Sequence, residues 1–172
     1  ARSFKNSAEL FILDKIIKNG YLVGDIDLNF DDNGKIKNDF EINGFIKNGE
    51  LGFLDRYNIK NLNFLFKIKD KKYFLKDIKT EFSQIKLSSE LITIKQQKDL
   101  FLINGNLSSD KKDIDIKILN NLLKDGLKNF NITNINFNLD TNFNFTINKK
   151  FKISNIDLKS KINLNQLSYY PK

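Results

Sequence analysis

The sequence predicts a mainly β protein, built as a long antiparallel meander with one or two short helices. Apolar and polar side chains alternate with a period of two along most of the chain after Gly20, which is the pattern of half-buried strands. Asn-Gly and lysine-rich turn signals separate the alternating stretches. Consecutive strands follow one another without the long crossovers that parallel pairing needs, so neighbouring strands are expected to be antiparallel.

The first expected element is a short amphipathic helix over residues 7–20. Ser7 is placed to cap its start, an apolar stripe follows at helical spacing, and Gly20 stands where a helix ends. Beyond this helix the apolar period changes from 3.6 to 2, which marks the start of the sheet.

Two early hairpin turns are expected in the sheet. Residues 31–34, DDNG, separate the alternating stretches 24–30 and 35–46. A second turn is predicted at Asn48 and Gly49, because Asn-Gly is the strongest short hairpin signal.

Further along, polar runs between alternating stretches predict additional turns. These runs are residues 70–72, 96–99, 108–112 and 148–150. The alternation also slips by one residue at Ile85 and Leu87, and this slip predicts a β-bulge. The triplet Ile-Asn-Gly occurs twice, at residues 42–44 and 103–105, as a loose internal similarity.

The C-terminal part holds one helical interruption and two long strands. Residues 118–127 carry apolar side chains at helical spacing, with Gly126 as the expected stop. Residues 134–148, NINFNLDTNFNFTIN, then alternate almost strictly. At about 3.3 Å per residue such a strand runs well beyond the usual five or six residues. Residues 151–167 alternate again, and the final YYPK reads as an exit to a linker or a further section.

Length and composition favour a single β-rich domain over residues 1–172 with no catalytic chemistry. The chain lacks Met, so Ala1 is expected to be a processed end or a cut within a longer protein. It also lacks Cys and His, which removes thiolate and imidazole nucleophiles, bases and metal ligands. The DDNG run lacks the ligand spacing of a calcium loop. We therefore expect no enzyme activity, no cofactor and no metal site.

The formal charge of +8 raises nucleic acid as a partner, because a basic sheet with aromatic residues can bind single strands. In such binders the aromatic and basic groups share one surface. Here Phe alternates with Lys, Asp and Asn, which predicts that rings and charges lie on opposite faces. Lysines at turns and a bias toward A/T-rich codons account for much of the charge, so no nucleic-acid partner is expected.

The apolar face raises the question of what covers it. Each Phe brings about 150–250 Å², so three rings of residues 134–148 already exceed the few hundred Å² that monomers normally expose. Two short helices are little cover for so many strands. Either a second layer of the chain seals the face, as in a structural or interaction domain, or the sheet curls into a half-open groove whose face binds acyl chains.

The sequence resembles the AsmA-like family of TamB- and YhdP-type proteins of the Gram-negative cell envelope. The resemblance is one of pattern across most of the chain: long alternating strands, few prolines, NG and DNG turns, the break KILNNLLKDGLKNF, and the ending FKISNIDLKSKINLNQL. It implies a section of a longer, repeating β-groove protein. It further implies a periplasmic location, anchoring to the inner membrane through regions outside this segment, and phospholipid transport between the inner and outer membranes.

On this reading the inward phase of each strand lines the groove and contacts phospholipid acyl chains. The lipid-binding residues that the resemblance implies are Phe40, Ile42, Leu62, Phe64, Phe66, Phe101, Ile103, Phe137, Phe143 and Phe145.

Overall fold

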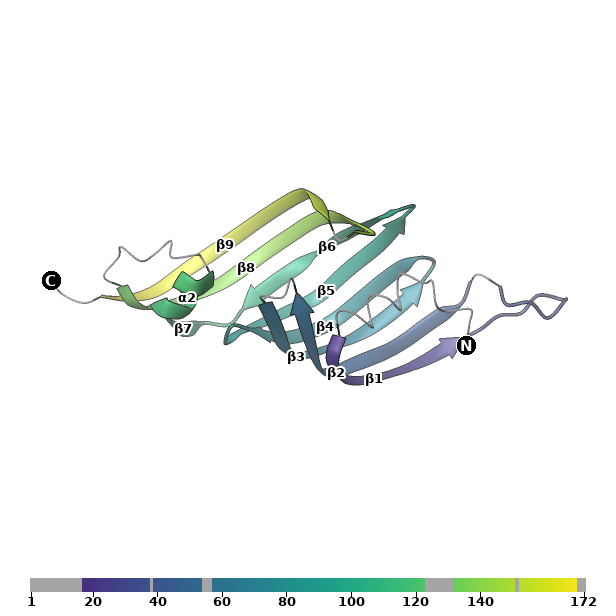
Figure 1. The fold of residues 1–172 in the computed structure, drawn as a ribbon, viewed down its shortest axis with the longest axis horizontal. Coiled ribbons are helices and arrows are strands. Elements are labelled where there is room, and N and C mark those ends of the chain that lie inside the picture. The colour runs from purple at the N-terminus through teal and green to yellow at the C-terminus, as the bar shows by residue number, and fades with distance from the viewer. Residues whose placement is uncertain (1–16, 38, 54–56, 123–131, 151, 170–172) are drawn as a thin grey trace.

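The computed structural model describes residues 17–37, 39–53, 57–122, 132–150 and 152–169. These residues form a long β-sheet with very little helix, as predicted (Figure 1). The elements are β1 (Ile17–Asp27), β2 (Glu41–Phe53), β3 (Tyr57–Lys69), β4 (Lys72–Phe82), β5 (Ile85–Gln97), β6 (Leu100–Ser109), β7 (Lys112–Asp115), α2 (Ile116–Leu122), β8 (Ile132–Asn148) and β9 (Ile153–Tyr169).

All pairings in this single nine-stranded sheet are antiparallel, so the predicted meander is confirmed. β6 and β7 pair with successive parts of the same edge of β8, and β9 pairs with its other edge. The strands lie side by side in one layer in Figure 1, from β1 at one end to β9 at the other. The sheet is open, because β1 and β9 each pair with a single strand among the described residues.

Several predicted turns are confirmed, and side chains or backbone geometry explain them. Asp31 Oδ1 accepts hydrogen bonds from the backbone N–H groups of Asn33 and Lys35, both at 2.9 Å, and closes the DDNG turn. Asp70 and Lys71 have φ of 50° and 59°, the paired positive values of a type I′ hairpin. The loops after β5 and β8 also fall where the polar runs predicted them.

Three predictions near the turns are wrong. The slip at Ile85 is not a bulge but a two-residue turn at Ser83 and Gln84, with φ of 48° and 69°. Phe82 then pairs directly with Ile85, three residues away, so the alternation only seems interrupted. The polar run 108–112 breaks the strand without reversing the chain, because β6 and β7 run in the same direction along β8.

The predicted Asn48-Gly49 hairpin is the third error, because β2 continues through it to Phe53. Asn48 has φ of 53°, and the register with β3 shifts between Ile46 and Gly49, so the pair forms a bulge. Asn tolerates this left-handed conformation, which serves a bulge as well as a turn.

Similar positive-φ residues stand inside neighbouring strands. They are Asn61 in β3 and Asp77 in β4, with φ of 53° and 52°. Each separates apolar positions of opposite parity: Leu75 precedes Asp77 by two residues, whereas Ile78 follows it immediately. Because an extra residue in a strand reverses the phase of alternation, the irregular residues keep the apolar side chains of both halves on one face.

The helix predictions are only partly met. α2 confirms the expected 118–127 helix, although it starts two residues earlier, at Ile116. Asp115 caps this start, because its Oδ1 accepts a hydrogen bond from the Lys117 backbone N–H at 2.7 Å. Its expected stop, Gly126, lies outside the described residues. Residues 7–16 of the first expected helix also lie outside them, but its last turn is wrong, because residues 17–20 belong to β1 and pair with β2.

The sheet has little buried core. The buried apolar side chains are Ile46, Leu62, Ile78, Phe101 and Ile114, and no described side chain falls below 2% exposure. The chain exposes 12846 Å², whereas a compact monomer of this size exposes about 8,700 Å². The single layer of described strands contributes to this excess, because each strand is shielded mainly by its two neighbours.

Gly44 provides a test of the cross-strand packing. A Cβ at this position would lie 2.5 Å from Phe66 Cζ and would overlap the Val23 carbonyl oxygen. We therefore expect Gly44→Ala to lower the free energy of unfolding by about 1–3 kcal/mol in urea titrations. Gly24→Ala is the matched control on the paired position of β1, where the nearest atoms would be 3.3 and 3.5 Å away. Equal effects of the two substitutions would contradict the packing described.

Candidate functional site

The largest candidate site is one face of the whole sheet. Directly paired residues of antiparallel strands point to the same side, so the registers assign each side chain to a face. The apolar face defined in this way includes Leu22, Ile26, Ile42, Ile46, Leu51, Ile59, Leu62, Phe64, Phe66, Ile68, Tyr73, Leu75, Ile78, Ile92, Ile94, Phe101, Ile103, Leu107, Ile135, Phe137, Leu139, Phe143, Phe145, Ile147, Leu158, Ile162 and Leu164.

Continuous apolar rows cross this face at right angles to the strands. One row follows printed pairings from β1 to β8: Ile26, Ile42, Ile68, Tyr73, Ile94, Ile103 and Phe145. A second follows pairings from β1 to β9: Gly24, Gly44, Phe66, Leu75, Ile92, Gly105, Phe143 and Leu158. At about 4.8 Å between strands the second row is roughly 34 Å long. Hydrocarbon therefore meets no charged side chain along either row.

Two glycines of the second row each pair with an aromatic residue of the next strand. Gly44 pairs with Phe66 and Gly105 pairs with Phe143, so the two Ile-Asn-Gly triplets occupy equivalent settings. A Cβ at Gly105 would lie 3.1 Å from Phe143 Cζ, so the ring lies over the bare backbone. The next ring along each strand is close as well: Phe143 and Phe145 have centroids 5.8 Å apart. Rings over glycines keep the surface apolar where no side chain is present.

The structure brings nine of the ten predicted lipid-contacting residues onto the apolar face. Among them Leu62 and Phe101 are buried, and the other seven are half-buried: Ile42, Phe64, Phe66, Ile103, Phe137, Phe143 and Phe145. Phe40 precedes β2 and is exposed, and no pairing assigns it to the face. Whether any of these residues contacts lipid stays a prediction.

Sequence reasoning missed the middle of the face. Tyr73, Leu75, Ile92 and Ile94 connect the two groups of predicted residues through β4 and β5. The alternation of residues 91–94 was visible, but the turn at Ser83 and the shift between Ser88 and Ile92 hid the common phase of these strands. Only the strand pairing registers assign these four residues to the apolar face.

Exposure of the face increases from its centre to the two edges. Leu22 and Ile26 in β1 and Leu158, Ile162 and Leu164 in β9 are all more than half exposed. Among the described residues the sheet is a single layer, so no second sheet packs on this face. The apolar side chains that the alternation predicted on one face are therefore accessible to solvent, most of all at the two edges.

The alternate residues of the same strands form a polar face. It carries mostly Lys, Asp, Asn and Ser, as predicted from the alternation. Phe45 and Phe74 are exceptions: Phe45 pairs with Val23 and Leu65, and Phe74 pairs with Lys67 and Thr93. The expectation that rings and charges separate completely is therefore wrong at these two phenylalanines, and Tyr21, which pairs with Lys47, is a further ring on this face.

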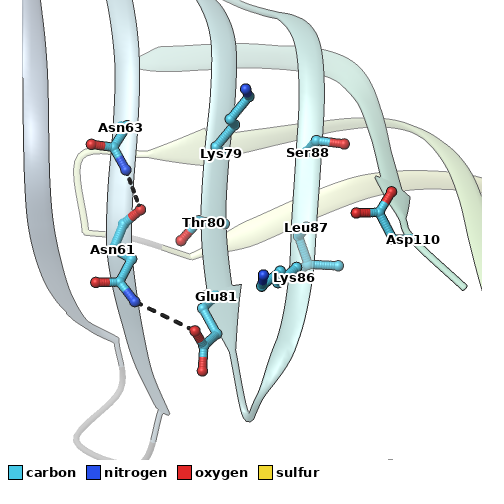
Figure 2. Close-up of a pocket in the computed structure, with 9 residues that line it drawn as sticks. All are labelled: Asn61, Asn63, Lys79, Thr80, Glu81, Lys86, Leu87, Ser88 and Asp110. Carbon is cyan, nitrogen blue, oxygen red and sulfur yellow. Dashed lines mark hydrogen bonds between the residues drawn. The ribbon is translucent and has the colours of Figure 1, made fainter. Parts of the chain in front are cut away.

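A pocket lined mainly by polar residues lies where β3, β4 and β5 meet the end of β6 (Figure 2). Its lining is Asn61, Asn63, Lys79, Thr80, Glu81, Lys86, Leu87, Ser88 and Asp110. Asn61 Nδ2 donates to Glu81 Oε2 at 3.4 Å, and Asn63 Nδ2 donates to the Asn61 carbonyl oxygen at 2.6 Å. The bond to Glu81 ties the Asn61 bulge to β4, and the bond from Asn63 braces the bulge within β3. None of the ten predicted lipid-contacting residues lines the pocket.

Glu41 holds the strongest electrostatic cluster of the polar face. Its carboxylate accepts from Lys67 Nζ at 2.6 Å and from Asn43 Nδ2 at 2.8 Å, and Lys69 Nζ lies 3.3 Å away. The bond with Lys67 is the main cause that lowers the pKa of Glu41 from 4.5 to about 2, with Asn43 and Lys69 adding to it. The cluster joins the start of β2 to the end of β3.

Comparisons with known proteins give no relative. No family model, no curated protein and no solved structure matches the chain. The likeness to AsmA-like proteins therefore stays a prediction. In the described part of the chain, no group of three or more Asp and Glu residues is placed to hold a metal ion, and no helix is long and apolar enough to cross a membrane.

The low pKa of Glu41 predicts how acid affects the sheet. Because the folded-state pKa is lowered, the contribution of the cluster is complete above pH 4.5 and is lost as the pH falls toward about 2. Urea titrations between these two pH values should show a smaller loss of stability in Glu41→Gln than in the parent protein. Glu90→Gln, at an exposed position of β5, is the control. If the pH dependence of stability in Glu41→Gln equals that of the parent protein, the Glu41 cluster is not the cause of the acid sensitivity.

The open face predicts a contrast between two Ile→Asp substitutions. Ile162 is 65% exposed at the edge, whereas Ile78 is 5% exposed at the centre. A charge at position 162 stays hydrated, so Ile162→Asp should retain the circular dichroism spectrum of the sheet. Ile78→Asp buries an unpaired charge and should unfold the protein or lower its stability by more than about 3 kcal/mol. Unfolding of Ile162→Asp would show that another part of the chain covers the edge.

Proposed function

We propose that the apolar face binds phospholipid acyl chains and that the chain is a section of a protein that moves lipid between two membranes of the bacterial envelope. The observation that carries this proposal is the uninterrupted apolar surface of a single-layer sheet. Soluble monomers rarely expose a contiguous apolar patch larger than about 300–600 Å². The apolar face crosses the sheet from β1 to β9 and carries exposed Leu and Ile side chains at both edges, which a hydrocarbon partner would cover.

The proposed mechanism is passive. An acyl chain on the face exchanges water for contacts with Ile, Leu and Phe side chains, a gain of roughly 25 cal/mol for each Å² buried. The contacts are similar from one row to the next, so a bound tail loses little when it shifts position. The headgroup stays in water beside the sheet. No side chain has to form a covalent bond, and the proposal involves no enzyme activity and no cofactor.

The proposed cellular setting comes from the resemblance to AsmA-like proteins. It places the chain in the periplasm, with anchoring to the inner membrane and contact with the outer membrane through parts of a longer protein. The open single layer supports the binding step of this proposal, because a groove for lipid tails needs a sheet with one apolar face left accessible. A sealed structural or interaction domain is the competing function, and it requires a cover for that face.

Lipid extraction tests the proposal directly. We expect organic extracts of the purified chain to contain phospholipid by mass spectrometry, and the delipidated chain to take up a fluorescent phospholipid. Phe145→Asp should reduce uptake at least about tenfold, since it places a charge in the first apolar row. Asn144→Asp is the matched control, with the same added charge on the adjacent residue of the polar face.

Circular dichroism separates the possible outcomes of this experiment. A folded Phe145→Asp chain without lipid supports the binding face. Unfolding of Phe145→Asp, together with lipid-free extracts and no uptake by the parent chain, would identify a sealed domain and overturn the proposal.

A further inference from the structure

The two edge strands of the sheet are long and exposed. β1 and β9 each pair on one side only among the described residues, and β9 has 17 residues. Residues 22–27 of β1 and 159–164 of β9 are exposed throughout. An edge of this kind presents unpaired backbone N–H and C=O groups that can pair with a further strand.

The two edge strands run in directions that allow antiparallel pairing between copies. Seven successive antiparallel pairings separate β1 from β9 through β2, β3, β4, β5, β6 and β8. Because seven is odd, β9 runs antiparallel to β1. If β9 of one copy lies beside β1 of another with the apolar faces on the same side, the antiparallel order of the sheet continues unbroken.

The charges of the two edges are complementary. Asp25 and Asp27 lie on the polar face of β1, and Lys159 and Lys161 lie on the polar face of β9. None of the four forms an ion pair with another described residue, although Lys161 stands opposite Asp140. Asp27 stands opposite Glu41, whose carboxylate already binds Lys67, so its own sheet offers Asp27 a like charge.

We propose that a second copy of this chain pairs with the first, β9 against β1, to give one continuous sheet. The register that places Asp25 opposite Lys161 also places Asp27 opposite Lys159. It sets Leu22 opposite Leu164 and Gly24 opposite Ile162 on the apolar face, so both faces match in a single alignment.

The contact is heterologous, because it joins two different edges. Each added copy leaves one β1 edge and one β9 edge free, so assembly is open-ended. In this register Gly24, where the second apolar row starts in one copy, stands opposite Ile162 on the apolar face of the next, four residues along β9 from Leu158. The inference concerns the edges alone and does not depend on lipid binding.

Charge reversal on the two edges tests the pairing. In lipid-free, low-salt buffer, the parent chain should sediment as a concentration-dependent series of oligomers in analytical ultracentrifugation. Asp25→Lys/Asp27→Lys and Lys159→Glu/Lys161→Glu should each associate roughly tenfold more weakly or worse, because like charges then face each other. An equimolar mixture of the two double variants should recover association, since each variant then meets an opposite charge.

Three results would overturn the pairing. They are a parent chain that stays monomeric at 100 µM as about the upper working concentration, double variants that associate as strongly as the parent, and a mixture that fails to recover association. Association that is insensitive to both double variants would indicate contact through the apolar faces instead. Lipid uptake by Asp25→Lys/Asp27→Lys, measured separately, distinguishes a failure of this pairing from a failure of the lipid proposal.

Discussion

The structure depends on one constraint: every strand of a single layer must direct its hydrocarbon to the same side. A slip of one residue would move the apolar set of a strand to the opposite face. The irregular residues Asn48, Asn61 and Asp77 make such slips in β2, β3 and β4, and the parity of the apolar positions changes at the same places. Each change in the parity of the apolar positions is therefore matched by an irregular backbone residue, and the apolar rows stay continuous from one edge strand to the other.

Small and large side chains share the apolar face in a way that suits a sheet without a second layer. In a two-layer protein, rings from the opposing layer fill the space above a glycine. Here Phe66 and Phe143 come from the adjacent strand and lie over Gly44 and Gly105. The sheet thus covers its glycine positions with rings from its own neighbouring strands. Both Ile-Asn-Gly triplets place their glycine under such a ring, which the sequence alone did not establish.

Much of the fold was predictable because it depends on local pattern. The period of two identified the strands, and DDNG identified a turn by the chemistry of Asp31. The errors arose where one local signal serves two geometries: Asn-Gly at residue 48 suits both a turn and a bulge, and a slipped phase at Ile85 suits both a bulge and a tight turn. Nine of the ten predicted residues share a face, but the connection through Tyr73 and Ile94 depends on register, which is a non-local property.

The meander has a consequence for how the protein loses its structure. Each strand packs only against the strands beside it, and few side chains are shielded from more than two directions. Chains organised in this way behave as linear arrays, whose free energy is a sum of nearest-neighbour terms. Local opening then begins at the ends of the sheet, so hydrogen exchange protection should rise from β1 and β9 toward β4 and β5.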